Sequence, residues 1–598
     1  MKNKGGPGMH QESKNNINKY RLLTIIILAV LLFGILVIRF FDLQIIRHAS
    51  FRSQAMGNML NRTDIAAPRG LVYDRDGRKL IYNIPSYNLV VYPDLIRQHP
   101  QTWQKLSEIC KVPVSTLQEN MKRNQVGAYR PAVVQRNIDF KTNTCINENI
   151  LDLPGVEVVF DPVREYLNDI KSGNILGYTA PIRARDFYTY SQEGYKPGDF
   201  VGYDGIEKQY EHLLKGERGY RYKQVNAVGK PLNDRAYEQI NPKPGDALYL
   251  TIDSRLQAEA ESLMSIHNGA AVLMNYENGE IIAAVSSPGY DPDLFNESLT
   301  QAQWDSISQD KRIPLFNRVI RGQYPAGSIY KMIAAIAALE KGVITPQTQF
   351  ECTGIYALGG REYRCSHVHG MEDLNEAIAH SCNIYFYNVI LELGVDDWCY
   401  FQKKLGFGEL TGIDLPGELP GIAPDRDFLD RQYGRRKWWK GTWLNMVIGQ
   451  GDVLITPMQA LRYTAILATR GKDPKPHLLK AVHSTKTKTM EYPEYPVHRI
   501  EGIAESTWME IESGMMNAVQ TNWGTGRTAN VPGLNMCGKT GTAQNPHGEA
   551  HAWFIGYSKR KDFPYAVAVF VEHGMGGSDT AAPVAGKLLK AWYYLRTS

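Results

Sequence analysis

Cysteine is scarce in this chain of 598 residues, which contains only seven. Seven cysteines are too few for a disulfide scaffold, and the odd number leaves at least one thiol unpaired within the chain. Charge of one sign is also scarce, because 67 basic residues stand against 62 acidic residues and leave a net charge of only +5. The two signs are mixed along the chain, so the sequence offers no basic footprint for a nucleic acid.

Long hydrophobic runs are rare as well, and the clearest one covers residues 22–41, interrupted only by Thr24, Gly34 and Arg39. About 20 apolar residues span a bilayer as a helix, so this run predicts a transmembrane anchor. A cleaved signal peptide would have a shorter apolar core and a cleavage site of small residues, which the sequence lacks here. Residues 1–21 are polar and carry five Lys or Arg residues against the single acid Glu12, so we expect them in the cytoplasm and the rest of the chain on the other side of the membrane.

The segment 42–249 lacks any cluster of catalytic residue types and is rich in Arg, Tyr, Gly and Pro. Short alternating runs within it predict strands, at Leu71–Tyr73, Tyr87–Tyr92 and Val156–Phe160. Residues 74–77 are typical of a hairpin turn, and helices are expected near residues 103–111 and 205–214. We interpret the segment as a β-rich pedestal or docking domain with an inserted head at about residues 93–155.

A different pattern covers residues 250–598. A helix at 254–266 precedes a β-hairpin formed by the runs 270–274 and 281–286. Three more strands are expected near the end of the chain, at 535–544, 551–557 and 565–572, and an amphipathic helix follows at 583–595. Strands at both ends with helices between them indicate one antiparallel sheet flanked by helices, an α+β fold.

Three other segments of this region have a distinct character. Thr456 and Pro457 predict the start of a helix that ends at Gly471. Residues 472–501 are rich in Lys, Pro and Tyr, so we expect them to be solvated. Residues 350–369 are rich in Gly, Cys and His and are interpreted as a loop.

The most informative stretch ends in Ser328-Ile-Tyr-Lys331 and is followed by an Ala/Ile/Leu-rich run, 332–340, which predicts a buried helix. Ser328 lies at the first turn, where free backbone N–H groups favour developing negative charge, and Lys331 lies one turn further on the same face. The spacing alone is a weak signal, because Ser308–Lys311 and Ser558–Lys561 also match it in polar settings.

Two further motifs follow in the chain. Ser381-Cys382-Asn383 is a weak signal by itself, whereas Lys539-Thr540-Gly541-Thr542 contains a rarer triplet that occurs once, at the start of a strand. Lys539 offers a cation for a carboxylate, and Gly541 allows a ligand backbone to approach the strand closely.

In this order and in these settings the three motifs resemble those of the penicillin-recognising serine enzymes, the penicillin-binding proteins and serine β-lactamases. Six further segments resemble class B penicillin-binding proteins: 69–77, 205–211, 251–253, 324–328, 448–451 and 551–556. Segments 381–387 and 581–584 look most like the penicillin-binding protein 2 branch, which acts in cell elongation and rod shape. The resemblance implies a transpeptidase domain at 250–598 behind the pedestal and one anchor in the bacterial inner membrane, with the catalytic domain periplasmic.

The resemblance also implies a role for each motif residue in cross-linking peptidoglycan stem peptides. Ser328 is the nucleophile, and β-lactams acylate it. Lys331 is the base and must be neutral, for which a half-buried site beside Lys539 would lower its pKa. Ser381 relays a proton to the leaving D-Ala, Asn383 positions Lys331, and the N–H groups of Ser328 and Thr542 form the oxyanion hole. Lys539, Thr540 and Thr542 hold the substrate carboxylate, beside Gly541.

The expected partners follow from what the chain lacks. No glycosyltransferase domain fits before residue 250, so the resemblance implies a SEDS-type, RodA-like glycosyltransferase and an MreC-like activator. The chemistry needs no cofactor. A septal class B transpeptidase is the main alternative. The anchor and pedestal argue against a β-lactamase, the single span argues against a β-lactam-sensing receptor, and the intact motifs argue against a silent scaffold.

Cys352, Cys365, His369 and Cys382, together with His367, fall between the first two motifs or within the second. Some members of the penicillin-binding protein 2 branch carry a zinc site there, made from two Asp, a His and the Cys of the second motif. His369 and Cys382 match the last two ligands, whereas Cys352 and Cys365 stand where Asp is expected. Three thiolates and an imidazole suit a structural Zn²⁺. A Cys352–Cys365 disulfide and plain buried thiols remain open alternatives.

Overall fold

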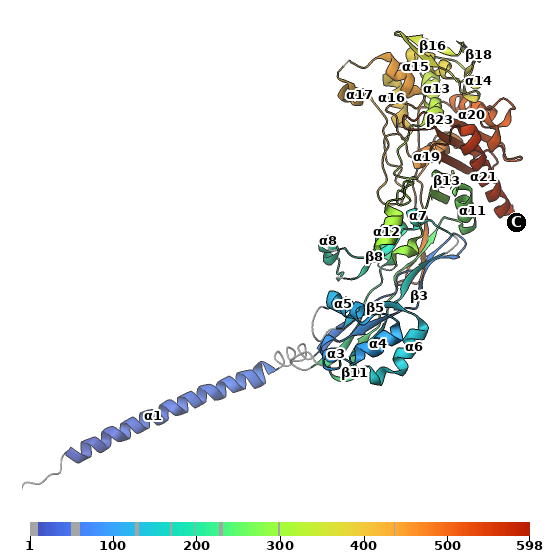
Figure 1. The fold of residues 1–598 in the computed structure, drawn as a ribbon. Coiled ribbons are helices and arrows are strands. Elements are labelled where there is room, and N and C mark those ends of the chain that lie inside the picture. Colours follow the sequence, from blue (N-terminus) through green and yellow to red (C-terminus); the bar gives the residue numbers. More distant parts are fainter. Residues whose placement is uncertain are drawn as a thin grey trace, which may run out of the picture.

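The computed structural model describes residues 10–48, 60–125, 131–167, 170–183, 185–196, 198–225, 231–296, 299–435 and 437–597. Figure 1 shows an elongated molecule in which one long N-terminal helix leads to a small head, then to a slender pedestal, and finally to a larger C-terminal domain. The first nine residues of the expected cytoplasmic tail lie outside the described residues.

Helix α1 (His10–Phe41) contains the hydrophobic run and continues into a short π-helix, Asp42–Ile46. Residues 21–46 are long and apolar enough to cross a membrane and are not buried against other parts of the protein. The helix begins inside the expected polar tail, because the residues before the apolar run include good helix formers such as Gln11, Glu12 and Lys14.

The head has a three-stranded sheet in the order β5–β4–β6, formed by Ala132–Ile138, Tyr87–Val91 and Val156–Phe160. Its helices are α3 (Pro93–Gln98), α4 (Thr102–Cys110), α5 (Val114–Asn124) and α6 (Phe140–Glu148). The head has a hydrophobic core of its own that includes Leu89, Leu106 and Val134. The strands expected at 87–92 and 156–160 and the helix near 103–111 are therefore confirmed.

The pedestal is built on two sheets. One has the order β1–β10–β11, formed by Leu60–Ile65, Gly219–Val225 and Pro231–Ile240. The other has the order β21–β20–β12–β2–β3–β7, formed by Met490–Glu491, Leu479–His483, Ala247–Leu250, Val72–Tyr73, Lys79–Ile84 and Val163–Tyr166. The turn between β2 and β3 confirms the predicted hairpin. Shorter elements connect the sheets: α7 (Gly173–Leu176), β8 (Thr179–Pro181), α8 (Phe187–Gln192) and β9 (Phe200–Gly202).

Strand β20 shows that the solvated interpretation of residues 472–501 was wrong in part. Leu478 and Leu479 are buried, and Val482 is 7% exposed. The reason is that β20 pairs with β12 across more than 200 residues of sequence and fills the pedestal sheet. The composition of the stretch did not reveal a pairing made at such long range.

A buried ionic cluster joins the start of the pedestal to α9 (Gly205–Gln209) and α10 (Glu211–Leu214). Arg69 Nη2 lies 2.5 Å from Glu207 Oε2 and 2.9 Å from Glu211 Oε2, while Arg164 Nε lies 2.6 Å from Glu207 Oε1. Burial alone would raise the pKa of Glu207, but the two guanidinium groups hold that pKa below its ordinary value. The segments 69–77 and 205–211 therefore meet in space and stabilise the pedestal.

The C-terminal domain contains the predicted antiparallel sheet, in the order β14–β13–β25–β24–β23. Its strands are Ile281–Ser287, Gly269–Asn275, Tyr565–Val571, His551–Ser558 and Met536–Ala543. Helices α11 (Ser254–Met264) and α21 (Ala582–Thr597) cover one face, and α19 (Pro457–Ala468) packs on the other. Because both faces are covered, nearly every residue of these strands is buried.

A helical subdomain lies beside this sheet, with α14 (Leu374–Ala379), α15 (Asn383–Leu393), α16 (Val395–Lys404), α17 (Arg426–Tyr433), α18 (Lys440–Val447) and α20 (Glu505–Gln520). The expected loop at 350–369 is more ordered than predicted. Strand β15 (Phe350–Cys352) pairs with β18 (Gly370–Glu372), and β16 (Ile355–Leu358) pairs with β17 (Arg361–Arg364). Gly359 and Gly360, at φ +59° and +77°, form the turn that makes the second pair a tight hairpin.

Candidate active site

Ser328 lies in a 3-10 turn, Gly327–Tyr330, that runs directly into α13 (Lys331–Glu340), the buried helix predicted from the sequence. The turn packs against β23. A Cβ atom on Gly327, whose φ is +59°, would lie only 2.9 Å from the carbonyl oxygen of Thr542. Gly327 N also donates to Gly449 O at 2.8 Å. Glycine at position 327 therefore allows the nucleophile turn to lie directly against the strand.

Hydrogen bonds to residues of the sheet and next to it hold the segment before Ser328. The hydroxyl of Tyr324 donates to Glu572 Oε1 at 2.7 Å, and the same oxygen accepts from Arg318 Nε at 2.9 Å. The indole N–H of Trp553 donates to Pro325 O at 2.9 Å. These bonds fix the entry to the turn that carries Ser328.

Lys331 brings the first and second motifs together. Its Nζ lies 2.7 Å from Asn383 Oδ1, 2.6 Å from Ser381 O and 3.3 Å from Ser381 Oγ. The side chain is fully buried, not half-buried as expected. Burial lowers the pKa of Lys331 to about 8, so a neutral amine is accessible near neutral pH.

The second motif lies in the bend between α14 and α15, where Ser381 has a φ of +62°. Asn383 is held at three points. Its side chain accepts from Lys331 and donates from Nδ2 to Arg364 O at 3.0 Å, and its backbone N–H donates to Cys365 Sγ at 3.2 Å. Strand β17 therefore supports the amide that orients Lys331.

The third motif lies on β23. Lys539 is fully buried and donates to Thr540 O at 3.0 Å, and burial followed by the charge of Lys331 holds the pKa of Lys539 well below its ordinary range. Thr540 Oγ1 donates to Thr525 Oγ1 at 2.8 Å, and Thr542 is exposed. The structure therefore brings all three motifs to one place, although the sequence separates Ser328 from Thr542 by more than 200 residues.

Gly541 has neighbours that the sequence did not suggest. A Cβ atom there would lie 3.1 Å from Ile329 Cγ2 and 3.2 Å from Ala326 O. The small residue thus lets the nucleophile turn approach the strand, whereas the sequence interpretation gave that space to a ligand backbone.

Two residues that the sequence left without a role contact these motifs. Gln450 Nε2 donates to Thr542 O at 3.3 Å, and Thr525 contacts Thr540. Gln450 belongs to segment 448–451, which resembles the family, so a signal for it existed. No local signal marks Thr525.

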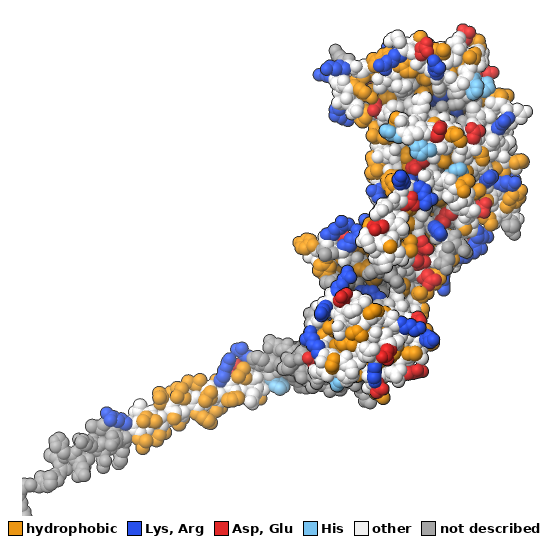
Figure 2. All heavy atoms as spheres, viewed as in Figure 1, with side chains coloured by type: hydrophobic (Ala, Val, Ile, Leu, Met, Phe, Trp, Pro, Cys, Tyr) orange, Lys and Arg blue, Asp and Glu red, His pale blue; other side chains and the backbone are white. Residues whose placement is uncertain are grey.

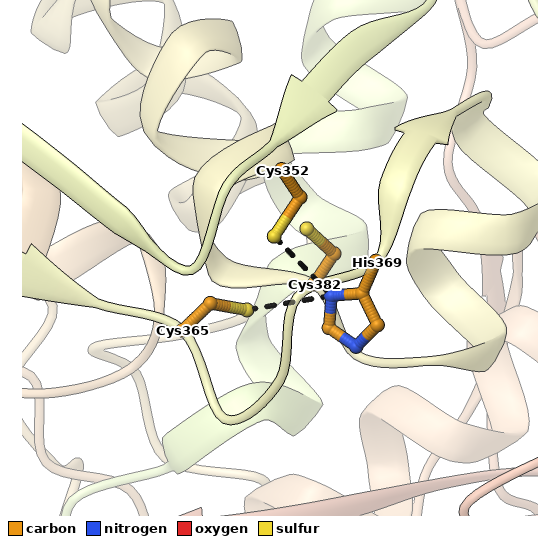
Figure 3. Close-up of side chains that lie close together, drawn as sticks. All are labelled: Cys352, Cys365, His369 and Cys382. Carbon is orange, nitrogen blue, oxygen red and sulfur yellow. Dashed lines mark hydrogen bonds between the residues drawn. The ribbon is translucent and has the colours of Figure 1, made fainter.

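Three thiols and one imidazole meet beside the second motif, as Figure 3 shows. The ligand atoms of Cys352, Cys365, His369 and Cys382 all lie within 4.8 Å of one another. His369 Nδ1 lies 3.4 Å from Cys352 Sγ and 3.6 Å from Cys365 Sγ. The hydrogen bond with Cys365 raises the pKa of His369 to about 9. His367 is not among the four, but its carbonyl accepts from Cys352 Sγ at 3.5 Å and its ring centre lies 5.9 Å from that of His369.

All seven cysteines are free thiols in the structure. Cys382 belongs to the group together with Cys352 and Cys365, and a hydrogen bond between the thiols of Cys382 and Cys365 lowers the pKa of Cys365. Such a compact group suits a shared cation better than a single disulfide between two of its members.

Comparison with known proteins gives consistent matches over most of the chain. Residues 269–590 match the model of the penicillin binding protein transpeptidase domain, and residues 64–250 match that of the penicillin-binding protein dimerisation domain. The peptidoglycan D,D-transpeptidase MrdA of Haemophilus influenzae is 30% identical, over 98% of this chain and 93% of the relative.

Solved structures also match this chain over most of its length. The complex between penicillin-binding protein 2 and MreC from Helicobacter pylori gives a TM-score of 0.79 at 28% identity, over 90% of this chain and 99% of that one. A structure described as the structural coordination of polymerization and crosslinking by a peptidoglycan synthase complex gives 0.71 at 28% identity, over 96% of this chain and 98% of that one.

Proposed function

The chain belongs to the class B penicillin-binding proteins and is a peptidoglycan D,D-transpeptidase, and from this premise we propose that Ser328 carries the acyl group during cross-linking. The observation that supports this assignment is the position of Lys331. Lys331 lies one helical turn after Ser328, and its amine is buried and is held by Asn383 at 2.7 Å. A nucleophile with an adjacent base that a third group orients is the arrangement that acyl transfer requires.

In the first half-reaction, the neutral amine of Lys331 takes the proton of Ser328 as Oγ attacks the penultimate D-Ala carbonyl. The backbone N–H groups of Ser328 and Thr542 stabilise the resulting oxyanion. Ser381 passes the proton from Lys331 to the nitrogen of the terminal D-Ala, which leaves as a free amino acid. An acceptor amine of a second stem peptide then attacks the ester, restores Ser328, and forms the cross-link.

The terminal carboxylate of the donor binds at β23. The hydroxyl of Thr542 donates to it, the hydroxyl of Thr540 donates to it after turning from Thr525, and Lys539 supplies positive charge from β23. A carboxylate that arrives beside Lys539 offsets the burial that lowers the pKa of this lysine, so substrate binding favours its charged form. A β-lactam presents the same carboxylate and amide groups and leaves an ester on Ser328.

Labelling with fluorescent penicillin tests the nucleophile. The wild-type chain should form a covalent adduct, and Ser328→Ala should form none. Ser308→Ala and Ser558→Ala are matched controls, because these serines have the same spacing to a lysine and lie elsewhere. Undiminished labelling of Ser328→Ala would refute the assignment.

The chain acts in elongation and rod shape, because its relatives and similar structures are MrdA and penicillin-binding protein 2 proteins. This disfavours the septal alternative. We propose that α1 is a single inner-membrane anchor with a cytoplasmic N-terminus and that the catalytic domain is periplasmic. We also propose a RodA-like glycosyltransferase and an MreC-like protein as partners, because a similar protein forms a complex with MreC.

The thiol and imidazole group suits a structural zinc ion. Cys352, Cys365, His369 and Cys382 would supply four ligands, and the ion would tie β15 and β17 to the second motif without taking part in acyl transfer. Metal analysis of protein purified without a histidine tag should find about one zinc per chain, and His369→Ala should lower both zinc content and melting temperature. A zinc content below about a tenth of an equivalent per chain, together with an unchanged melting temperature of His369→Ala, would refute the zinc site.

A further inference from the structure

Helix α14 ends in a turn whose usual residue is glycine. Cys382 N donates to Ala377 O at 2.9 Å and Ser381 N donates to Ile378 O at 3.3 Å, the pair of bonds that closes a helix in a Schellman motif. The turn residue of this motif is left-handed and is most often glycine, because a Cβ atom disfavours that conformation. Ser381 stands there with a φ of +62°. The second motif therefore holds its serine in a strained backbone conformation.

The strain has a functional reason, because Ser381 must keep a hydroxyl near Lys331. Its Oγ lies 3.3 Å from Lys331 Nζ, and its carbonyl accepts from the same nitrogen at 2.6 Å. Glycine would relieve the strain, but it would remove the hydroxyl that relays the proton. A strained residue persists only where the surrounding structure holds it. Contacts beyond the turn itself must therefore keep this serine in place.

The residue immediately before Ser381 is held by a buried carboxylate. His380 lies at the end of α14, and its Nδ1 donates to Oε1 of Glu372, the last residue of β18. The side chain of Glu372 is 2% exposed, whereas that of His380 is 30% exposed. Among the described residues, Oε2 of Glu372 is buried and has no hydrogen-bond partner, so His380 alone satisfies this carboxylate. This bond ties the start of the turn to β18.

Two aromatic rings lie against the same imidazole. The rings of His380 and His369 are stacked, with their centres 5.4 Å apart and their planes at 7°. The centre of the Trp523 ring lies 4.7 Å from that of His380. Trp523 belongs to the loop after α20, and Thr525 of that loop donates from N and Oγ1 to Ala379 O, at 3.4 and 3.3 Å. Three segments outside α14 therefore hold the end of this helix.

The imidazole is held without being part of the closed core. Figure 2 shows histidine side chains at the surface of the end of the domain where β18 and α14 lie. A smaller side chain at position 380 would therefore open toward solvent and leave no closed cavity. The effect of such a substitution should be confined to the turn that follows.

We propose that His380 is a positioning residue for acyl transfer. Glu372 fixes its imidazole, and the fixed imidazole keeps the left-handed turn in the conformation that places the Ser381 hydroxyl beside Lys331. His380 touches no substrate and acts through Ser381. This role rests on the transpeptidase function proposed above, because it serves the proton relay of that reaction, and it lies outside the three motifs.

A double-mutant cycle on the full-length protein tests whether His380 acts through Ser381. The rate constant of acylation by fluorescent penicillin is measured for the wild type, His380→Ala, Ser381→Ala and the double variant. A displacement of the hydroxyl by less than about 1 Å should make His380→Ala about tenfold slower than the wild type. In the Ser381→Ala background the same substitution should cost less than about threefold, because no hydroxyl remains to be displaced and Asn383 still holds Lys331. Equal costs in the two backgrounds would overturn the proposal.

A conservative variant tests the hydrogen bond itself. His380→Asn keeps an N–H group two bonds from Cβ, where Nδ1 lies, so it should recover most of the wild-type rate. A rate as low as that of His380→Ala would overturn the role of the bond. Glu372 is left without a partner in His380→Ala, and if this variant does not fold, His380→Ala combined with Glu372→Gln replaces it in both backgrounds, because it buries no unpaired charge.

His367→Ala is the matched control, because it removes a neighbouring imidazole and leaves the bond between Glu372 and His380. The ring of His367 lies 5.9 Å from that of His369. This variant should keep the wild-type rate, and a loss equal to that of His380→Ala would overturn the proposal. Labelling of the wild type at Ser328 with equal costs in the cycle overturns the role of His380 alone. A wild type that is never labelled at Ser328 overturns the proposed function and this role together.

Discussion

Gly327 is the point at which the nucleophile turn comes closest to β23, so Gly327→Ala perturbs the catalytic geometry with a single methyl group. The new Cβ would lie 2.9 Å from Thr542 O and 3.2 Å from Thr542 N, and real Cβ atoms are not found below about 3.0 Å from such atoms. The turn must therefore move away from the strand by a few tenths of an ångström. Alanine at φ +59° adds about 1 to 2 kcal/mol of backbone strain.

The displacement separates the N–H groups of Ser328 and Thr542, which together bind the oxyanion. A misplacement of about 1 Å can cost roughly 100-fold in rate, so a smaller shift should cost about tenfold in the rate constant of acylation by penicillin. The rate is measured from a time course of labelling with fluorescent penicillin, quenched at set intervals, and folding is checked by thermal unfolding.

Gly342→Ala is the matched control for strain. Gly342 lies just beyond the other end of the same helix at φ +66°, and nothing lies within 4 Å of the position its Cβ would take. Both variants should lose about 1 to 2 kcal/mol of stability, and only Gly327→Ala should lose acylation rate. An acylation rate in Gly327→Ala equal to that of Gly342→Ala would refute the idea that contact with Thr542 sets the geometry.

Three other predictions concern the base, the pedestal and the anchor. Lys331→Arg should abolish penicillin labelling, because a guanidinium cannot lose its proton to act as a base, and retained labelling would move the base elsewhere. Glu207→Gln should lower stability by about 3 kcal/mol, measured by denaturant unfolding, because Arg69 and Arg164 would keep buried charges without a partner. Folding lowers the pKa of Glu207 from 4.5, so its contribution in the wild type is present above about pH 4.5 and is lost as the pH falls, and a pH-independent difference from Glu207→Gln would contradict this. A chain without residues 1–60 should still be labelled by penicillin but should not support rod growth in cells, and rod growth would show that the anchor is dispensable.

Much of the fold is predictable from local pattern. The hairpin of β13 and β14, the three C-terminal strands and the helix capped by Thr456 all lie within a few residues of their expected bounds. Each of these elements is encoded by the periodicity of its own side chains and by the turn or cap residues at its ends. The buried helix α13 is encoded by its run of small and aliphatic residues in the same way.

The candidate site was predictable only as three motifs in order. The sequence placed Ser328 and Lys331 on one face of a helix, because that spacing is local. It did not show that Lys331 is fully buried, since burial depends on the packing of α15 and β23 around it. It also gave no sign of Thr525, which is linked to the site by contacts with Thr540 and with Ala379 O that are made in the folded state.

The sequence by itself therefore determined the long apolar helix, the type of most elements and the polar and charged groups that the three motifs offer, because hydrophobic period, turn residues and motif spacing act within one or two turns of chain. The tertiary structure decided which of those groups meet. It placed β20 in the pedestal sheet, gathered three cysteines and His369 into one group, and brought Trp523 against His380. Such contacts join residues far apart in the chain, and they form only when buried surfaces pack together, which no local pattern specifies.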